Sequence, residues 1–143
     1  MSIQAILDRK GPEVITIHAT ATVRSAADRM RERSIAALVV ESGDAIAGLI
    51  SERDIVHAVS RHGERALSMA VLEVVTHSTI TVAPDDTVKR AMSLMTHHRV
   101  RHLPVIANDK LVGIVSIGDA VKSRLEEVEL EANVLRDSYL ATH

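Results

Sequence analysis

Two short segments of the sequence place a glycine, a serine and an aspartate at the same spacing. They read Gly48-Leu49-Ile50-Ser51-Glu52-Arg53-Asp54 and Gly113-Ile114-Val115-Ser116-Ile117-Gly118-Asp119. An apolar run followed by Ser-x-x-Asp predicts a strand that leads into a helix, with both polar side chains at the helix N-terminus. The unpaired N–H groups and the helix dipole there favour an acceptor or an anion. One carboxylate can also accept two hydrogen bonds from paired hydroxyl groups. Ser-x-x-Asp is equally a helix cap with an acidic third residue, and the two roles are compatible.

The two motifs belong to an internal repeat of the chain. A shift of 65 residues aligns Ile15–Val56 with Ile80–Val121 without a gap, and thirteen of the 42 aligned positions are identical. Many of the other pairs exchange one aliphatic residue for another. An ungapped match of this length indicates a tandem duplication.

Each copy predicts the element order β-α-β-β-α. Thr22 and Thr87 are expected helix N-caps, because apolar residues at helical spacing follow each of them. Ser51 and Ser116 are expected to begin the second helix of each copy. Short β-branched and aliphatic runs separated by turn residues predict the strands. The expected strands are 14–17, 38–40 and 46–50 in the first copy, and 79–82, 103–106 and 111–115 in the second.

Three further segments flank the repeats. Ile3–Lys10 predicts a short helix closed by Gly11-Pro12, and Ala66–Val75 predicts a connecting helix. Beyond Asp119 the helical pattern continues, with apolar residues at alternating steps of four and three. Such a stripe packs either on its own domain or against the same helix of a second copy in a homodimer. The stripe consists of Val121, Leu125, Val128, Ala132, Leu135 and Tyr139.

The duplicated motif resembles a tandem pair of cystathionine β-synthase (CBS) domains. Arg101-His102-Leu103-Pro104-Val105 adds to the resemblance, because a hydrophobic strand with proline is common in that family. The resemblance implies an α+β fold: two β-α-β-β-α CBS units packed with pseudo-twofold symmetry, plus an N-terminal helix and an extended C-terminal helix. The expected boundaries are 8–65 and 72–128 for the two CBS domains and 129–143 for the C-terminal extension.

The resemblance also implies a function in regulation rather than catalysis. CBS pairs carry two clefts for adenosine-containing ligands such as AMP, ADP, ATP, NAD(H) or S-adenosylmethionine, and AMP or NAD(H) is favoured here. The family commonly forms dimers, so a homodimer that signals to an unidentified protein partner is expected, with no metal required. The alternative is a non-sensing interaction protein whose clefts are vestigial.

The family pattern assigns ligand roles to residues of both copies. Asp54 and Asp119 would accept hydrogen bonds from the ribose hydroxyls, and Ser51 and Ser116 would bond the sugar or its first phosphate. The adenine would lie between aliphatic side chains of the opposite repeat. These are Thr79, Ile80, Val100 and Pro104 for the cleft of Asp54, and Val14, Ile15, Ile35 and Val39 for the cleft of Asp119.

The two copies differ in the cations that could bind phosphate. Arg53 precedes Asp54, whereas Gly118 precedes Asp119; Arg101 and His102 correspond to two alanines in the first copy. In the crosswise family arrangement Arg53, Arg101 and His102 converge on the cleft of Asp54, and a guanidinium group suits phosphate. The cleft of Asp119 keeps Lys10 as its cation. The sequence therefore predicts unequal sites.

Composition excludes several other classes of protein. The 143 residues carry a net charge of −2, and Tyr139 is the one aromatic residue. Both facts argue against nucleic-acid binding. No cysteine is present, no apolar run approaches the ~20 residues of a membrane span, and the start lacks a secretory pattern, so a cytoplasmic protein is expected. His97, His98 and His102 lack carboxylates at metal-ligand spacing, and no catalytic triad is evident.

Overall fold

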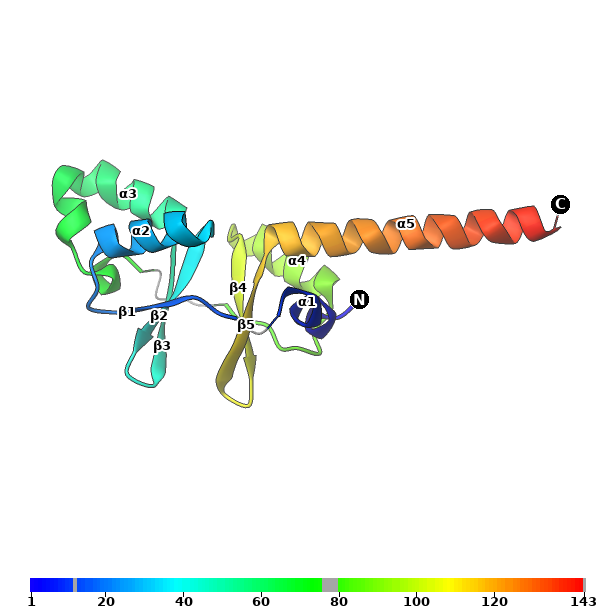
Figure 1. The fold of residues 1–143 in the computed structure, drawn as a ribbon, viewed down its shortest axis with the longest axis horizontal. Helices are drawn as coiled ribbons and strands as arrows, with labels where there is room; N and C mark the ends of the chain where they lie inside the picture. Colours follow the sequence, from blue (N-terminus) through cyan, green and yellow to red (C-terminus); the bar gives the residue numbers. More distant parts are fainter. Residues whose placement is uncertain (12, 76–79, 143) are drawn as a thin grey trace. The chain divides into compact units, whose positions relative to one another are not determined.

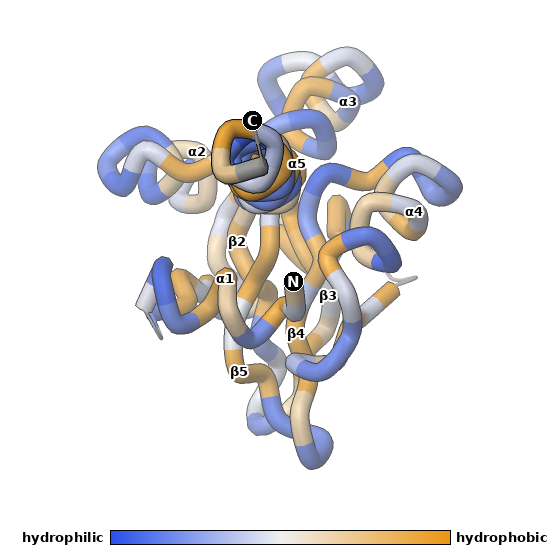
Figure 2. The backbone as a smooth tube through the Cα atoms, turned by 90° about the vertical axis from the view of Figure 1, so that its right-hand side faces the viewer, coloured by the Kyte–Doolittle hydropathy of each residue, from blue (hydrophilic) through white to orange (hydrophobic). Residues whose placement is uncertain are grey.

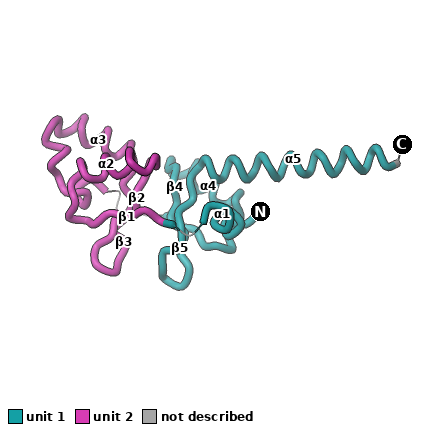
Figure 3. Tube along the Cα trace, viewed as in Figure 1, with its two compact units in different colours: residues 1–13, 80–143 teal, residues 14–79 magenta. Residues whose placement is uncertain are grey.

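The computed structural model describes residues 1–11, 13–75 and 80–142 and divides the chain into two compact units. Unit 1 combines Met1–Glu13 with Ile80–His143, and unit 2 is Val14–Thr79 (Figure 3). The N-terminal segment therefore packs with the second sequence repeat rather than with the first. The element order is β-α-β-β-α in unit 2, and the second repeat in unit 1 follows it from its first helix onward (Figure 1).

Unit 2 contains a three-stranded sheet and two α-helices. Strand β1 (Thr16–His18) pairs in parallel with β2 (Ala37–Ser42), and β2 pairs antiparallel with β3 (Ala45–Ser51). Helix α2 (Val23–Arg33) joins β1 to β2, and α3 (Glu52–His62) follows β3 directly. The predicted strand 14–17 is confirmed only in part, because the ladder begins at Thr16. The predicted cap of α2 is confirmed, since the Thr22 side chain accepts a hydrogen bond from the Ser25 N–H.

One face of this sheet forms the core of unit 2. Leu38, Val40 and Ile50 are fully buried and pack with Ala26 and Met30 of α2. Side chains alternate between the two faces of a strand, so Val39 points to the other face. Gly43 begins the two-residue turn between β2 and β3, and its positive φ of 63° is a conformation that glycine adopts without strain.

The predicted connecting helix 66–75 is wrong. The structure has two short 3₁₀ helices there, Gly63–Ser68 and Val71–Glu73, separated by extended backbone at Met69 and Ala70. The Met69 carbonyl accepts a hydrogen bond from the Val23 N–H at 2.9 Å, and the Val71 N–H donates to the Ala21 carbonyl at 2.8 Å. These bonds tie the segment to the start of α2, so tertiary pairing overrides the local helical pattern.

Among its described residues, unit 1 repeats the arrangement with a two-stranded sheet. Helix α4 (Val88–His98) leads to β4 (His102–Ala107), which pairs antiparallel with β5 (Lys110–Ser116), and α5 (Ile117–Thr142) follows β5. The Thr87 side chain caps α4 as predicted. Leu103, Val105 and Val115 are fully buried and form the core with residues of α4 and α1.

The predicted strand 79–82 is not formed by the residues that the structure describes there. Thr79 lies outside them, and Val82 makes only an isolated parallel bridge to Val105. The chain then turns, because the Ala83 N–H donates to the Asp86 carboxylate at 2.7 Å and Pro84 has no N–H to extend a ladder.

Helix α1 (Ile3–Lys10) completes the core of unit 1. Ser2 caps it, and Ile3, Ile6 and Leu7 are buried against the second repeat. Gly113 lies under Leu7, and a Cβ atom at Gly113 would stand 2.5 Å from the Leu7 Cδ2. The glycine of the second motif is therefore explained by the close approach of α1.

Helix α5 extends well beyond the other elements of unit 1 (Figure 1). The stripe predicted along it does not pack on its own unit: Val121 is 41% exposed, Leu125 57% and Leu135 73%. Packing on its own domain is thus excluded for the stripe. None of the helices among the described residues combines the length and apolar character that crossing a membrane requires.

We expect Gly113→Ala to lower the free energy of unfolding by about 1–3 kcal/mol, because the new methyl group overlaps Leu7. Chemical denaturation measures the change. Gly118→Ala is the matched control, since its Cβ would approach only Ser116 Oγ, at 3.6 Å. In a Leu7→Ala background the cost of Gly113→Ala should largely vanish. Equal costs in the two backgrounds would contradict the steric explanation.

Candidate functional site

The first half-site lies where β3 of unit 2 becomes α3. The Ser51 Oγ accepts a hydrogen bond from the Asp54 N–H at 3.3 Å, and the Asp54 Oδ2 accepts from the Ser51 N–H at 2.8 Å. The Ser51 hydroxyl also lies 3.0 Å from the same carboxylate oxygen. This is a reciprocal capping box, which satisfies two N–H groups that the helix leaves unpaired.

The second half-site repeats this geometry where β5 of unit 1 becomes α5. The Ser116 N–H donates to the Asp119 Oδ2 at 2.9 Å, and the Asp119 N–H donates to the Ser116 Oγ at 3.1 Å. Lys10 adds a contact through the end of α1. Its Nζ lies 2.8 Å from the Asp119 Oδ2 and 3.0 Å from the Ile114 carbonyl. The structure thus places Lys10 against Asp119 within unit 1, and its predicted role as the cation of a ligand cleft stays a prediction.

The environment of Asp119 shifts its pKa. Partial burial acts to raise the pKa of this carboxyl, but the hydrogen bonds from Lys10 and Ser116, together with the charge of Lys10, outweigh it. The pKa of Asp119 consequently lies below its ordinary value of 3.8. The carboxylate stays charged at neutral pH and is half-buried, so it remains an acceptor for a further donor.

A second pair of equivalent hydrogen bonds joins each helix start to the residue just before the first strand of its hairpin. The Glu52 N–H donates to the Ala36 carbonyl at 3.0 Å in unit 2, and the Ile117 N–H donates to the Arg101 carbonyl at 2.8 Å in unit 1. Arg101 thus lies beside the Ser116–Asp119 motif of its own unit, next to His102 at the start of β4. Its predicted role in the cleft of Asp54 remains a prediction.

Asp54 also lines a cavity of about 540 Å³ within unit 2. The sequence interpretation missed the other polar residues of this cavity. Most of them lie on α3, one and two turns beyond Asp54, and one lies on the second 3₁₀ helix. Steps of three and four residues along a helix place side chains on one face, so this spacing is the sequence signal for the residues on α3. The polar residues of the cavity are His57, Ser60, Arg61, His62 and Glu73.

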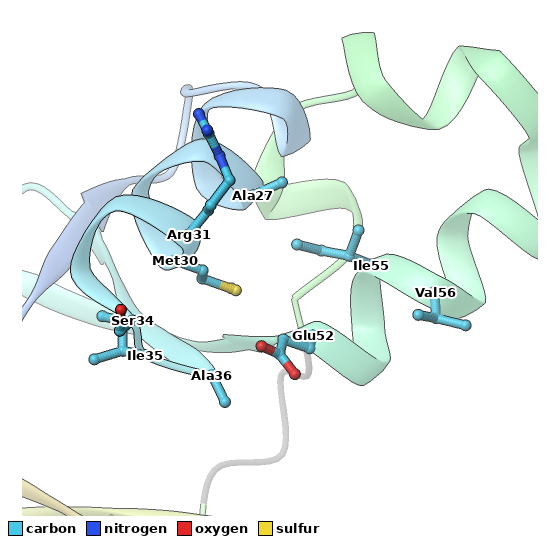
Figure 4. Close-up of a pocket in the computed structure, with 9 residues that line it drawn as sticks. All are labelled: Ala27, Met30, Arg31, Ser34, Ile35, Ala36, Glu52, Ile55 and Val56. Carbon is cyan, nitrogen blue, oxygen red and sulfur yellow. The ribbon is translucent and has the colours of Figure 1, made fainter.

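A second cavity, of about 610 Å³, opens between α2 and α3. It is mainly apolar, and Figure 4 shows Met30 and Ile55 pointing toward one another across it while the head of Arg31 points away. Ile35, predicted to contact the base in the cleft of Asp119, lines this cavity in its own unit beside Glu52. The space therefore adjoins the start of α3.

The remaining predicted site residues are divided between the two units. In unit 2, Val14 and Ile15 are half-buried just before β1, and the Ile15 carbonyl accepts from the Val39 N–H at 3.2 Å. Arg53 is exposed on the first turn of α3.

In unit 1, Pro104 is buried, and the side chains of Ile80 and Val100 pack against the core. Thr79 lies outside the described residues. The crosswise assignment of these residues to two clefts stays a prediction.

Comparison with known proteins identifies the family. The family model described as the CBS domain matches residues 8–61 and again residues 71–126. The chain belongs to the CBS domain family. CBS domain pairs generally serve as regulatory modules that bind adenosine ligands.

The relatives of this CBS pair include proteins of similar and of greater length. A mitochondrial CBS domain-containing protein of Arabidopsis thaliana is 40% identical over 111 residues, and the match covers 74% of this chain but only 54% of that protein. A crystal structure of a CBS-domain containing protein from Agrobacterium tumefaciens is 35% identical, with a TM-score of 0.85, and the match covers 87% of this chain and 99% of that one. A hexameric CBS-CP12 protein from bloom-forming cyanobacteria is 30% identical with a TM-score of 0.77, covering 99% and 85% of the two chains.

We expect Lys10→Gln to reduce the acid sensitivity of the protein. A carboxyl whose pKa is lowered in the folded state contributes stability that is present above its unfolded pKa and is lost as the pH falls through the folded value. Loss of Lys10 brings the pKa of Asp119 back up and shrinks this contribution. Denaturant unfolding at about pH 7 and about pH 3 should show a smaller stability difference in the variant than in the parent.

Lys110→Gln is the control for this measurement, because Lys110 is an exposed lysine at the start of β5. It removes the same charge from the chain and should leave the pH dependence nearly unchanged. A Lys10→Gln variant with the same pH dependence as the parent would contradict the assigned ion pair.

Proposed function

We propose that this CBS pair is a regulatory module that binds an adenosine-containing ligand through Asp54 and Asp119. The observation that supports the proposal is the duplicated capping box. In both units a half-buried carboxylate stands at the N-terminus of a helix, held by the serine three residues before it. A carboxylate fixed in this way is oriented before a ligand arrives, so little side-chain freedom is lost on binding.

The chemistry of each half-site fits the sugar of a nucleotide. The capping bonds described for Asp119 fall on Oδ2, and a carboxylate has acceptor capacity on both oxygens for a pair of vicinal hydroxyls. A phosphate on the same sugar would be attracted by the positive end of α3 or α5. The family arrangement supports a base pocket formed by aliphatic residues of the opposite repeat, as the sequence predicts.

We further propose that the two sites differ in their affinity for phosphate. At the site of Asp119 the Lys10 ammonium group already donates to the carboxylate and to the Ile114 carbonyl, so part of its hydrogen-bonding capacity is used before a phosphate arrives. The site of Asp54 has the exposed Arg53 on the first turn of α3 and Arg61 in the adjoining cavity. In the crosswise arrangement Arg101 and His102 add to that site. The site of Asp54 would therefore bind the more highly charged ligand, such as AMP or NAD(H).

The effect of the ligand would be regulatory. A ligand shifts a conformational equilibrium only through different affinities for the two states, and the opening of two CBS repeats is one such equilibrium. The protein would act as a homodimer and signal to a protein partner; the hexameric state of the related CBS-CP12 protein supports self-association. The second candidate is an interaction protein with vestigial clefts, which the exposed stripe of α5 favours.

Isothermal titration calorimetry with AMP tests the proposal. We expect binding to the parent protein, and a loss of about tenfold or more in affinity at one site in each of the variants Asp54→Ala and Asp119→Ala, because each loses hydrogen bonds to a charged group. Arg101→Ala should weaken only the site that Asp54→Ala weakens. GMP in place of AMP tests the specificity for adenine.

Thr87→Ala is the matched control for the two aspartate variants. It removes a helix cap of α4 in the same unit as Asp119 and should cost about 1 kcal/mol of stability without changing the affinity for AMP. The absence of AMP, NADH and S-adenosylmethionine binding in the folded parent would favour the second candidate. Equal loss at both sites in the Arg101 and Asp119 variants would defeat the proposed asymmetry.

A further inference from the structure

The exposed apolar stripe of α5 has the geometry of a coiled-coil seam. Its residues repeat at steps of four and three, and this alternation keeps a seam facing a partner helix over about three heptads. All of them are exposed, Val128 by 45% and Tyr139 by 61%. The α5 stripe comprises Val121, Leu125, Val128, Ala132, Leu135 and Tyr139.

The opposite side of α5 is the one that packs on unit 1. Ala120 and Ser123 are buried, and α5 contacts α4, α1 and β5 through its first turns. Glu126 pairs with Arg9, and Glu127 lies 3.7 Å from the N-terminal amino group. The α5 stripe therefore faces away from the unit that anchors the helix. Figure 2, which looks along α5, shows hydrophobic and hydrophilic residues at different points around it.

Charged residues line both flanks of the α5 stripe. One flank carries Lys122, Glu129 and Arg136, and the other carries Arg124 and Glu131. These are the positions whose charges meet across a coiled coil and set the orientation of its helices. In a parallel, in-register pair Arg124 meets the partner's Glu129, and Glu131 meets the partner's Arg136. Both contacts join opposite charges, and symmetry produces each of them twice.

The antiparallel alternative brings like charges together. With the α5 stripe in contact along its length, Val121 would face the partner's Tyr139. Lys122 would then meet the partner's Arg136, and both Glu129 and Glu131 would meet their own counterparts. The charge pattern thus disfavours the antiparallel pair by repulsion and favours the parallel one by attraction.

We propose that the α5 helices of two copies of this chain pair in parallel and in register along the α5 stripe. The buried stripe supplies the binding energy, and the flanking charges select the orientation, because exposed ion pairs are individually weak. The inference rests on the homodimer of the proposed function and is independent of the ligand, so loss of nucleotide binding leaves it intact.

Charge reversal tests the orientation. At low ionic strength we expect Arg124→Glu and Glu129→Arg, each alone, to raise the dimer dissociation constant at least about fivefold in sedimentation equilibrium, because each creates two like-charge contacts. An equimolar mixture of the two variants should recover the parental affinity as a heterodimer, since both contacts are again attractive. This recovery also controls for the loss of the contact between Arg124 and Glu127 within the helix, 3.4 Å apart.

A single introduced cysteine tests the geometry, because the chain has no cysteine of its own. Tyr139→Cys should form a disulfide-linked dimer readily on mild oxidation if the helices are parallel. In the antiparallel pair each such cysteine lies opposite Val121, about 27 Å along the helix from the other cysteine, and cannot reach it. Asp137→Cys, on the opposite side of α5, is the matched control and should crosslink far more slowly.

Leu130 and Val134 provide the control for the choice of face. Both are exposed, and they lie on the side of α5 opposite the α5 stripe. Leu130→Ala with Val134→Ala should preserve the dimer, whereas Leu125→Ala with Leu135→Ala should dissociate it. The proposal would be overturned if Leu130→Ala with Val134→Ala dissociated the dimer while Leu125→Ala with Leu135→Ala preserved it. An unchanged dissociation constant in Arg124→Glu, or an oligomer whose mass differs from twice 15.5 kDa, would also overturn it. A parent protein that is monomeric would overturn both this proposal and the homodimer, while an antiparallel dimer overturns only this one.

Discussion

The start of a helix directly after a strand is the constraint on which both half-sites depend. The first turn of a helix leaves backbone N–H groups without partners, and a capping box pairs two donors with a serine and a carboxylate. Here Ser51 with Asp54, and Ser116 with Asp119, provide that pairing in equivalent places. The requirement for a cap orients a carboxylate beside the positive end of a helix, and the same orientation suits the recognition of a sugar phosphate. Capping and ligand binding are therefore two uses of one local geometry.

Much of this fold could be predicted from the sequence, because the duplication doubles each local signal. Thr22 and Thr87 cap their helices as expected, and in each motif the glycine lies within the strand while the serine and aspartate lie where that strand meets a helix. The strand predicted at 79–82 fails for a local reason, the turn at residues 83–86, whereas the failed connecting helix involves contacts far apart in the chain. The 66–75 segment forms 3₁₀ helices because its backbone bonds to the start of α2, and neither this pairing nor the packing of α1 on the second repeat leaves a periodic pattern in the sequence.

The candidate site, like the fold, could be predicted only in part from the sequence. The sequence named Lys10 as the cation for the cleft of Asp119, but the direct contact between the two side chains, which lowers the pKa of the carboxyl, comes from the structure. His57 was not singled out and Arg61 was interpreted as a solvated residue, although both lie on the same face of α3 as Asp54 and line its cavity. Their spacing carries helical information, but only the structure shows that this exposed face of α3 lines a cavity together with Asp54 and Glu73.

The comparison of AMP with 2′,3′-dideoxyadenosine monophosphate tests the ribose assignment most directly. The two ligands share the base and the phosphate and differ in the hydroxyl pair that Asp54 and Asp119 are proposed to bind. We expect calorimetry to show AMP binding about tenfold tighter or more. The preference should disappear in the double variant Asp54→Asn with Asp119→Asn. Equal affinities of the parent protein for the two ligands would contradict the assignment of these carboxylates to the sugar.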